Sequence, residues 1–329
     1  MLKITLSIIL VIFIPFVKIG MAEIFTSAEY TLYISVISLS LLMGSVCFGV
    51  YPSLFPDKIV AENKVGTDII SVFSFAILLF ISVYQFGIYL AIVVVLIALF
   101  TGVHEACIYY YSLINRNDNV IRLDVINLLS YLVVFVMAIF AGFNYFWFIY
   151  IYTIFFIFVY AKFYKKRLGF IYKHIDKEIS LMRVVNFLLQ ASVLLLPLLI
   201  TQYFDARQAE ITIVLIYLIG LPVAFNQLVV NRVLYSNFSN NKIYIYFSGI
   251  LLIESASFYI ITSFFTVDSF NLKTISYLFE LNLFTFCFFL LSRLLFSLMY
   301  ALSRLEKVKP LYSLYIESFK LVFILLIVY

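Results

Sequence analysis

Long apolar stretches alternate with short polar loops along the whole chain. Eleven stretches are long enough to cross a hydrocarbon layer of about 30 Å as helices. Their predicted limits are 4–20, 31–51, 69–84, 88–113, 123–142, 145–163, 185–202, 210–231, 243–266, 279–302 and 310–329. The pattern therefore predicts an all-α polytopic membrane protein.

Two of the predicted connections are unusually short. Residues 85–87 and 142–144 each contain one glycine between apolar stretches, which predicts tight helical hairpins. Aromatic residues gather at these hairpins, as they do where helices leave a bilayer. Tyr84, Tyr89, Tyr145 and Trp147 are therefore predicted to anchor the helix ends at the membrane interface.

Positive charge is concentrated in every second loop. Of the 22 lysines and arginines, 17 lie at the N-terminus or in five loops that begin near residues 56, 115, 162, 232 and 304. The intervening loops contain only Arg207 and Lys273. Because basic loops stay in the cytoplasm, the charge pattern predicts a multi-pass protein with a cytoplasmic N-terminus.

Composition supports the membrane interpretation and excludes other classes. Hydrophobic residues make up 65% of the chain and charged residues 12%, against roughly a quarter charged in soluble domains. The net charge of +5 does not indicate nucleic-acid binding, because the cations lie beside helix ends, where they meet anionic lipids. The three cysteines lack metal-ligand spacing, so we expect neither a metal nor a cofactor.

The longest basic loop divides the chain into six predicted spans and five. We expect an N-terminal six-helix bundle over 1–163, a basic cytoplasmic linker over 164–184 and a five-helix bundle over 185–329 that lacks a twelfth helix. An Ala-Glu-x-Thr sequence around Glu29 recurs around Glu210, 181 residues later. Six helices separate the two copies, so the bundles are predicted to be parallel internal repeats.

Several ionisable residues lie inside predicted spans, where a charge is costly and usually faces the protein interior. The three cations are Lys18, Arg293 and Lys320. Lys18 either snorkels to the interface or faces a cavity. Arg293 lies at mid-depth and either lines a cavity or pairs with a buried glutamate.

Two acids lie at similar depth. Glu254 and Glu317 either carry a coupling ion or belong to ion pairs, with Lys320 one turn from Glu317. Two prolines lie within the seventh and eighth spans. Pro197 and Pro222 each remove a backbone hydrogen bond and are predicted to act as hinges.

Three stretches resemble the lipid-linked oligosaccharide flippases of the multidrug/oligosaccharidyl-lipid/polysaccharide exporter superfamily. Residues 18–33 are similar to that family's first-helix cation followed by a glutamate-tyrosine start of the second helix. Residues 44–49 resemble the phenylalanine-glycine pair at which the second helix ends in that family. Residues 221–235 resemble the family's proline in the eighth helix and the tyrosine that follows it. Thr31 replaces the family's usual glycine.

The resemblance implies a transporter of the bacterial cytoplasmic (inner) membrane and not an enzyme. Such a protein flips an undecaprenyl-diphosphate-linked oligosaccharide for O-antigen or capsule assembly, with Lys18 as a ligand of the diphosphate. Its implied partners are the polyprenyl-diphosphate-linked glycan, membrane lipids, a polysaccharide polymerase and a chain-length regulator. The alternative is a membrane-embedded polymerase or glycosyltransferase of the same pathway, although the predicted outer loops reach only about ten residues.

Overall fold

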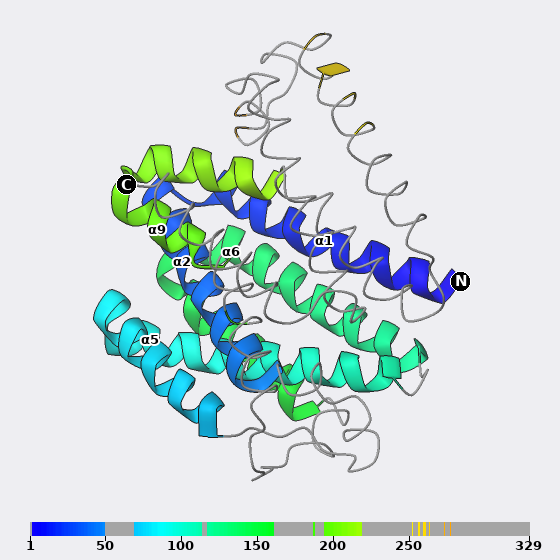
Figure 1. Ribbon diagram of the computed structural model, residues 1–329. Helices are drawn as coiled ribbons and strands as arrows, with labels where there is room; N and C mark the ends of the chain where they lie inside the picture. Colours follow the sequence, from blue (N-terminus) through cyan, green and yellow to red (C-terminus); the bar gives the residue numbers. More distant parts are fainter. Residues whose placement is uncertain are drawn as a thin grey trace. The chain divides into compact units, whose positions relative to one another are not determined.

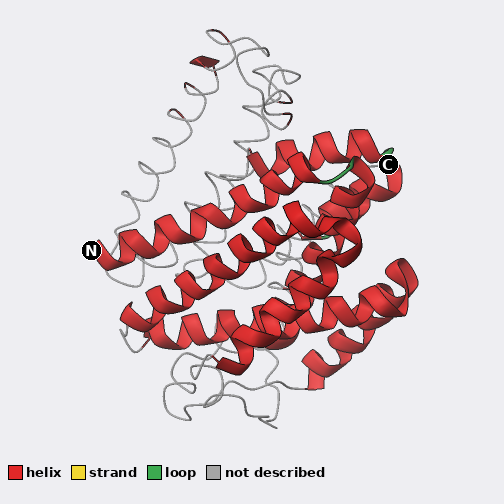
Figure 2. Ribbon diagram, turned by 180° about the vertical axis from the view of Figure 1, so that it is seen from behind, coloured by secondary structure: helices red, strands yellow, loops and turns green. Residues whose placement is uncertain are grey.

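The computed structural model describes residues 2–49, 69–113, 117–160, 187 and 194–218, together with 252, 256, 259, 260, 263, 273 and 277. Every element formed by these residues is a helix (Figure 2). The elements are α1 (Leu2–Ile24), α2 (Ser27–Gly44), a π-helix η1 (Ser45–Gly49), α5 (Ile69–Leu113), α6 (Asn117–Tyr160) and α9 (Leu196–Tyr203). Residues 206–218 are also helical.

The described residues are those of a membrane protein. Three helical segments, Ser27–Cys47, Val72–Glu105 and Asp118–Phe155, are long and apolar enough to cross a bilayer. The predicted all-helical membrane class is therefore confirmed, while the count of eleven spans and the two bundles stay predictions. Spans 243–266, 279–302 and 310–329 and the linker 164–184 lie largely or wholly outside the described residues.

Both predicted hairpins are present. Gly87 interrupts α5 with φ 78° and ψ 170°, and Gly142 interrupts α6 with φ 66° and ψ 173°. These angles fall in a region that is essentially restricted to glycine. Each helix is accordingly drawn as two arms that meet at a sharp bend (Figure 1). The apolar stretches before and after each glycine thus form separate arms, as the sequence predicts.

The chain divides into two compact units that are interleaved in sequence. The first unit contains Met1–Tyr30 and Ala206–Lys309, and the second contains Thr31–Asp205 and Pro310–Tyr329. Within the second unit, α5 packs against both η1 and α6. Within the first, the helix of residues 206–218 lies alongside α1 in both views (Figures 1 and 2).

Helix α2 begins at Ser27, four residues before the predicted apolar stretch, because a capping box starts it. The Glu29 carboxylate accepts hydrogen bonds from the Thr26 backbone N–H (2.9 Å) and hydroxyl (2.8 Å). The Thr26 hydroxyl oxygen in turn accepts from the Glu29 N–H at 3.4 Å. This exchange satisfies N–H groups that a helix start leaves unpaired, so the polar residues extend the helix.

The break between α1 and α2 and the break between α9 and helix 206–218 have the same local form. Phe25 donates its N–H to the Met21 carbonyl after α1, and Phe204 donates to the Ile200 carbonyl after α9. Thr26 and Asp205, both good N-cap residues, follow directly and precede the next helix. These breaks are 179 residues apart, whereas the Ala-Glu-x-Thr sequences are 181 apart. Glu210 therefore lies two positions deeper in its helix than Glu29 does in α2.

Helix α2 approaches α5 unusually closely at Gly44. A Cβ atom built on Gly44 would lie 2.5 Å from the Thr101 Oγ1 and 2.8 Å from the Ala98 carbonyl oxygen. Small residues allow such an approach between membrane helices. The next five residues, Ser45–Gly49, form the π-helix, and π-helical turns are most common as single insertions in longer helices. Residues 44–49 thus have a packing role.

Candidate functional site

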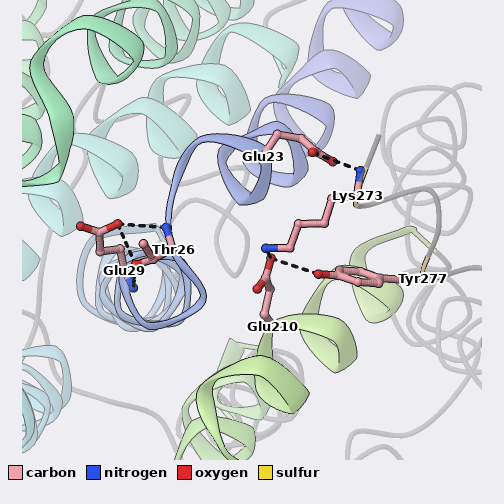
Figure 3. Close-up of polar contacts among 6 residues, drawn as sticks. All are labelled: Glu23, Thr26, Glu29, Glu210, Lys273 and Tyr277. Atoms are coloured by element: carbon pink, nitrogen blue, oxygen red, sulfur yellow. Dashed lines mark hydrogen bonds and ion pairs between the residues drawn. The ribbon is translucent and has the colours of Figure 1, made fainter. Parts of the chain in front are cut away.

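The most distinctive polar cluster in the described residues belongs to the first unit. Glu210, in the helix of residues 206–218, forms an ion pair with Lys273 at 2.5 Å between Oε1 and Nζ. The Tyr277 hydroxyl donates to the same oxygen over 3.4 Å. The Lys273 backbone N–H donates to the Glu23 carboxylate at the end of α1, at 3.2 Å. Figure 3 shows the Lys273 side chain directed at Glu210, with Glu23 beside its backbone.

The two partners of the ion pair differ strongly in exposure. The Glu210 side chain is fully buried, whereas 42% of the Lys273 side chain is exposed. Partial burial of Lys273 favours its neutral form, but the hydrogen bond and negative charge of Glu210 outweigh this and raise the pKa of Lys273. Burial and the Glu210 charge also raise the pKa of Tyr277. Both groups therefore keep their protons at neutral pH.

Among the described residues, the Glu210 carboxylate is bound through only one of its oxygens. Oε1 faces both the Lys273 ammonium and the Tyr277 hydroxyl, whereas the buried Oε2 has no hydrogen-bond partner among the described residues. A buried carboxylate normally needs several donors to offset its lost hydration. Lys273 is therefore the principal compensation for this charge within the described cluster.

Sequence reasoning did not select Glu210 or Lys273 as a pair. They are 63 positions apart, and no spacing rule connects residues so distant. One signal was present: Lys273 is one of only two basic residues in the predicted outer loops, and Glu210 begins an apolar span. A cation on a side with few basic residues is a reason to look for a buried acid.

Of the predicted site residues, Lys18 and Pro197 lie in described parts of the chain. Lys18 lies in α1 and is 8% exposed, so its ammonium is covered by protein. Pro197 is buried in the first turn of α9, directly after a bend at Leu195. A proline suits this position because the first turn has no hydrogen bond to lose, so Pro197 does not remove a hydrogen bond of α9 as the sequence predicted. The remaining residues, Arg293, Lys320, Glu254, Glu317 and Pro222, lie outside the described residues.

An aromatic cluster joins α2 to the second arm of α6 in the second unit. The Tyr33 and Phe146 rings meet edge to face at 5.4 Å, and the Phe146 and Trp147 rings at 5.0 Å. Trp147 is only 4% exposed, so the prediction that it anchors a helix end at the membrane interface is wrong. It packs inward because it follows the Gly142 turn on the face of α6 that meets α2. Tyr84 and Tyr145, by contrast, are exposed.

Polar contacts group the loops that were predicted to share one side of the membrane. In the second unit, Gln202 near the end of α9 donates to Gln85 at the α5 hairpin at 3.2 Å. In the first unit, Lys273 joins Glu23 to Glu210. All five residues lie in or beside the loops that contain few lysines and arginines. The assignment of that side to the cell exterior rests on the charge pattern alone.

Comparisons with protein-family models, with curated proteins and with solved structures found no match to this chain. Within the described residues, no group of three or more histidine, cysteine, aspartate or glutamate side chains is arranged to hold a metal ion. The buried charges are therefore the features of this chain that point to a function.

Proposed function

We propose that this protein is a flippase that moves an undecaprenyl-diphosphate-linked oligosaccharide across the bacterial cytoplasmic membrane. Alternating access between two helix bundles would carry the glycan outward for O-antigen or capsule assembly. Lys18, Arg293 and Lys320 would hold the diphosphate, and Pro197 and Pro222 would act as hinges. Glu254 and Glu317 would carry a coupling ion or pair with these cations.

The observation that carries this proposal is the covered position of Lys18. It lies in a 23-residue helix that is otherwise largely apolar, and the residue is 8% exposed. Lys18 lies two residues before the predicted end of its span, and ionisable residues within membrane spans usually face the protein interior and mark a substrate or ion path. A fixed cation there can offset the desolvation of a diphosphate that must cross the same medium.

The diphosphate site is tested with purified protein in vesicles that contain a fluorescent undecaprenyl-diphosphate oligosaccharide. Replacing Arg293 by alanine should slow flipping about a hundredfold, the factor that corresponds to about 2.7 kcal/mol of lost charge stabilisation. Arg293→Lys should retain part of the rate because the charge remains. The rate is measured from the loss of fluorescence when an impermeant quencher is added.

Arg207→Ala is the matched control, because Arg207 is exposed and its removal changes the net charge equally. It should flip at the wild-type rate. Lys18→Met keeps most of the side-chain volume and should slow flipping as Arg293→Ala does. Normal flipping by both Lys18→Met and Arg293→Ala would refute the diphosphate site, and no flipping by the wild-type protein would refute the function.

The proposed orientation places the N-terminus and residues 164–184 in the cytoplasm. Single cysteines at Lys166 and Arg207, in a background without native cysteines, should respond differently to an impermeant maleimide. Intact cells should label Arg207→Cys only, and permeabilised cells should label both. Labelling of Lys166→Cys in intact cells would reverse the topology.

A further inference from the structure

One side of the second arm of α6 is an exposed aromatic stripe. Its members follow one another at spacings of three, four and three residues, which places them along one face of a helix. They are Tyr145, Phe148, Tyr152 and Phe155, and each is 63–68% exposed. On the opposite side, Phe146 and Tyr150 are buried in the aromatic cluster that meets α2. The stripe therefore faces away from the core of the second unit.

The stripe differs from the outward face of the first arm of the same helix. The exposed side chains of the first arm are mainly aliphatic and include Leu129, Val133, Val136 and Ile139. Lipid tails accept aliphatic and aromatic side chains about equally well, so lipid contact alone does not account for four aromatic residues in succession. Rings gain stabilisation when they pack against other rings, and helices associate in membranes through such packing. The composition of the stripe therefore favours contact with another protein surface.

Tyr152 lies far from both membrane interfaces. It follows the hairpin glycine Gly142 by ten residues, which is about 15 Å along a helix and half of a hydrocarbon layer of about 30 Å. Tyrosine is usually concentrated at the interfaces, where its hydroxyl reaches water. Hydrocarbon offers no hydrogen-bond partner, so an outward-facing hydroxyl at this depth is costly unless another polar group meets it.

We propose that the aromatic stripe is the interface at which two copies of this protein associate in the membrane. Two copies related by a two-fold axis along the membrane normal present the same residues at the same depth. Tyr152 of one copy then lies opposite Tyr152 of the other, and a phenol hydroxyl can both donate and accept a hydrogen bond. The stripe is therefore complementary to itself, which a lipid tail is not. The association does not depend on the proposed transport function.

Cross-linking through single cysteines tests the position of the interface. In a background without native cysteines, Tyr152→Cys and Phe148→Cys should each form a disulfide-linked dimer when membranes are oxidised, and a reductant should return the monomer. Ile77→Cys is the matched control and should stay monomeric. Ile77 is exposed on the first arm of α5, ten residues before Gly87, so it lies as far from its hairpin as Tyr152 does. Equal cross-linking at all three positions would indicate random collision and overturn the interface.

The strength of the association can be measured by energy transfer between labelled copies in lipid vesicles at rising protein-to-lipid ratios. Tyr152→Phe keeps the ring and removes the hydroxyl, so it should raise the dissociation constant about threefold, the factor for a hydrogen bond of about 0.6 kcal/mol between membrane helices. Phe148→Ala combined with Phe155→Ala should weaken association further, because two rings are lost. Ile77→Ala should leave the dissociation constant unchanged.

Two results of this measurement would contradict the proposal. A wild-type protein that stays monomeric at every protein-to-lipid ratio would show that lipid alone covers the stripe. A dimer whose dissociation constant is the same in all stripe variants would have its interface elsewhere. The variants should keep the wild-type melting temperature, because the replaced side chains are exposed. None of these measurements uses lipid-linked glycan, so a failure of flipping leaves the dimer intact and a failure of the dimer leaves flipping untouched.

Discussion

Replacing Gly44 by valine is expected to prevent stable packing of α2 against α5. Even the Cβ of alanine would lie 2.5 Å from the Thr101 hydroxyl oxygen and 2.8 Å from the Ala98 carbonyl oxygen. Neither atom can move freely. The carbonyl is part of the α5 backbone, and the hydroxyl donates to the Ile97 carbonyl at 2.9 Å. Forcing extra carbons into such a contact costs about 1–3 kcal/mol, so alanine should destabilise and valine more so.

The size of this effect can be measured by thermal unfolding in detergent with a thiol-reactive dye. Cys47 and Cys107 are buried in the folded protein and become reactive when it unfolds. Gly44→Ala should lower the melting temperature, and Gly44→Val should leave little folded protein. Thr101→Ala, tested alone and with Gly44→Ala, should restore part of the loss, because it removes the hydroxyl and leaves the carbonyl. A wild-type melting temperature for Gly44→Ala would contradict the close approach.

Alanine at either hairpin glycine is expected to destabilise the protein through the backbone alone. A Cβ at Gly87 or Gly142 would touch nothing within 4 Å. However, φ near 70° combined with ψ near 170° is essentially restricted to glycine. A residue forced into such a conformation costs about 1–3 kcal/mol. Gly87→Ala and Gly142→Ala should therefore each lower the melting temperature, and the double variant should lower it by about the sum.

Asparagine separates this explanation from a general need for a turn residue. Asparagine tolerates the left-handed helical region, where ψ is about 47°, but not a ψ near 170°. Gly87→Asn should therefore be as destabilised as Gly87→Ala. Asn144→Ala, at an exposed position two residues after Gly142, is the matched control and should unfold as the wild type does. Rescue by asparagine would show that the turn adopts a different conformation.

The sequence was sufficient where local chemistry decides the structure. A glycine between two apolar stretches predicted the turns at Gly87 and Gly142, because the chain must reverse within a few residues. The start of α2 was missed, since the polar residues from Ser27 onward were assigned to a loop, although Thr26 and Glu29 form a capping box. That signal lay within four residues and was available.

The pairing of residues that are distant in sequence could not be predicted from the sequence in the same way. The motif shared by Glu29 and Glu210 suggested equivalent positions, yet one glutamate caps a helix and the other is buried against Lys273. Which cation a buried acid meets depends on how two segments 63 residues apart pack against each other. A single sequence does not specify that packing. Ser35 and Thr201, whose hydroxyl oxygens lie 3.4 Å apart, are a second such pairing between α2 and α9.

The outward-facing apolar side chains of α5 and α6 have a consequence for how such a chain evolves. Phe73, Phe80 and Phe140 are 68–80% exposed, so in a membrane they are available to contact lipid tails. Lipid distinguishes poorly between leucine, isoleucine and phenylalanine, so selection at these positions preserves hydropathy and leaves identity free to drift. Relatives of this protein should therefore be sought by the spacing of its apolar stretches, its hairpin glycines and its few buried charges.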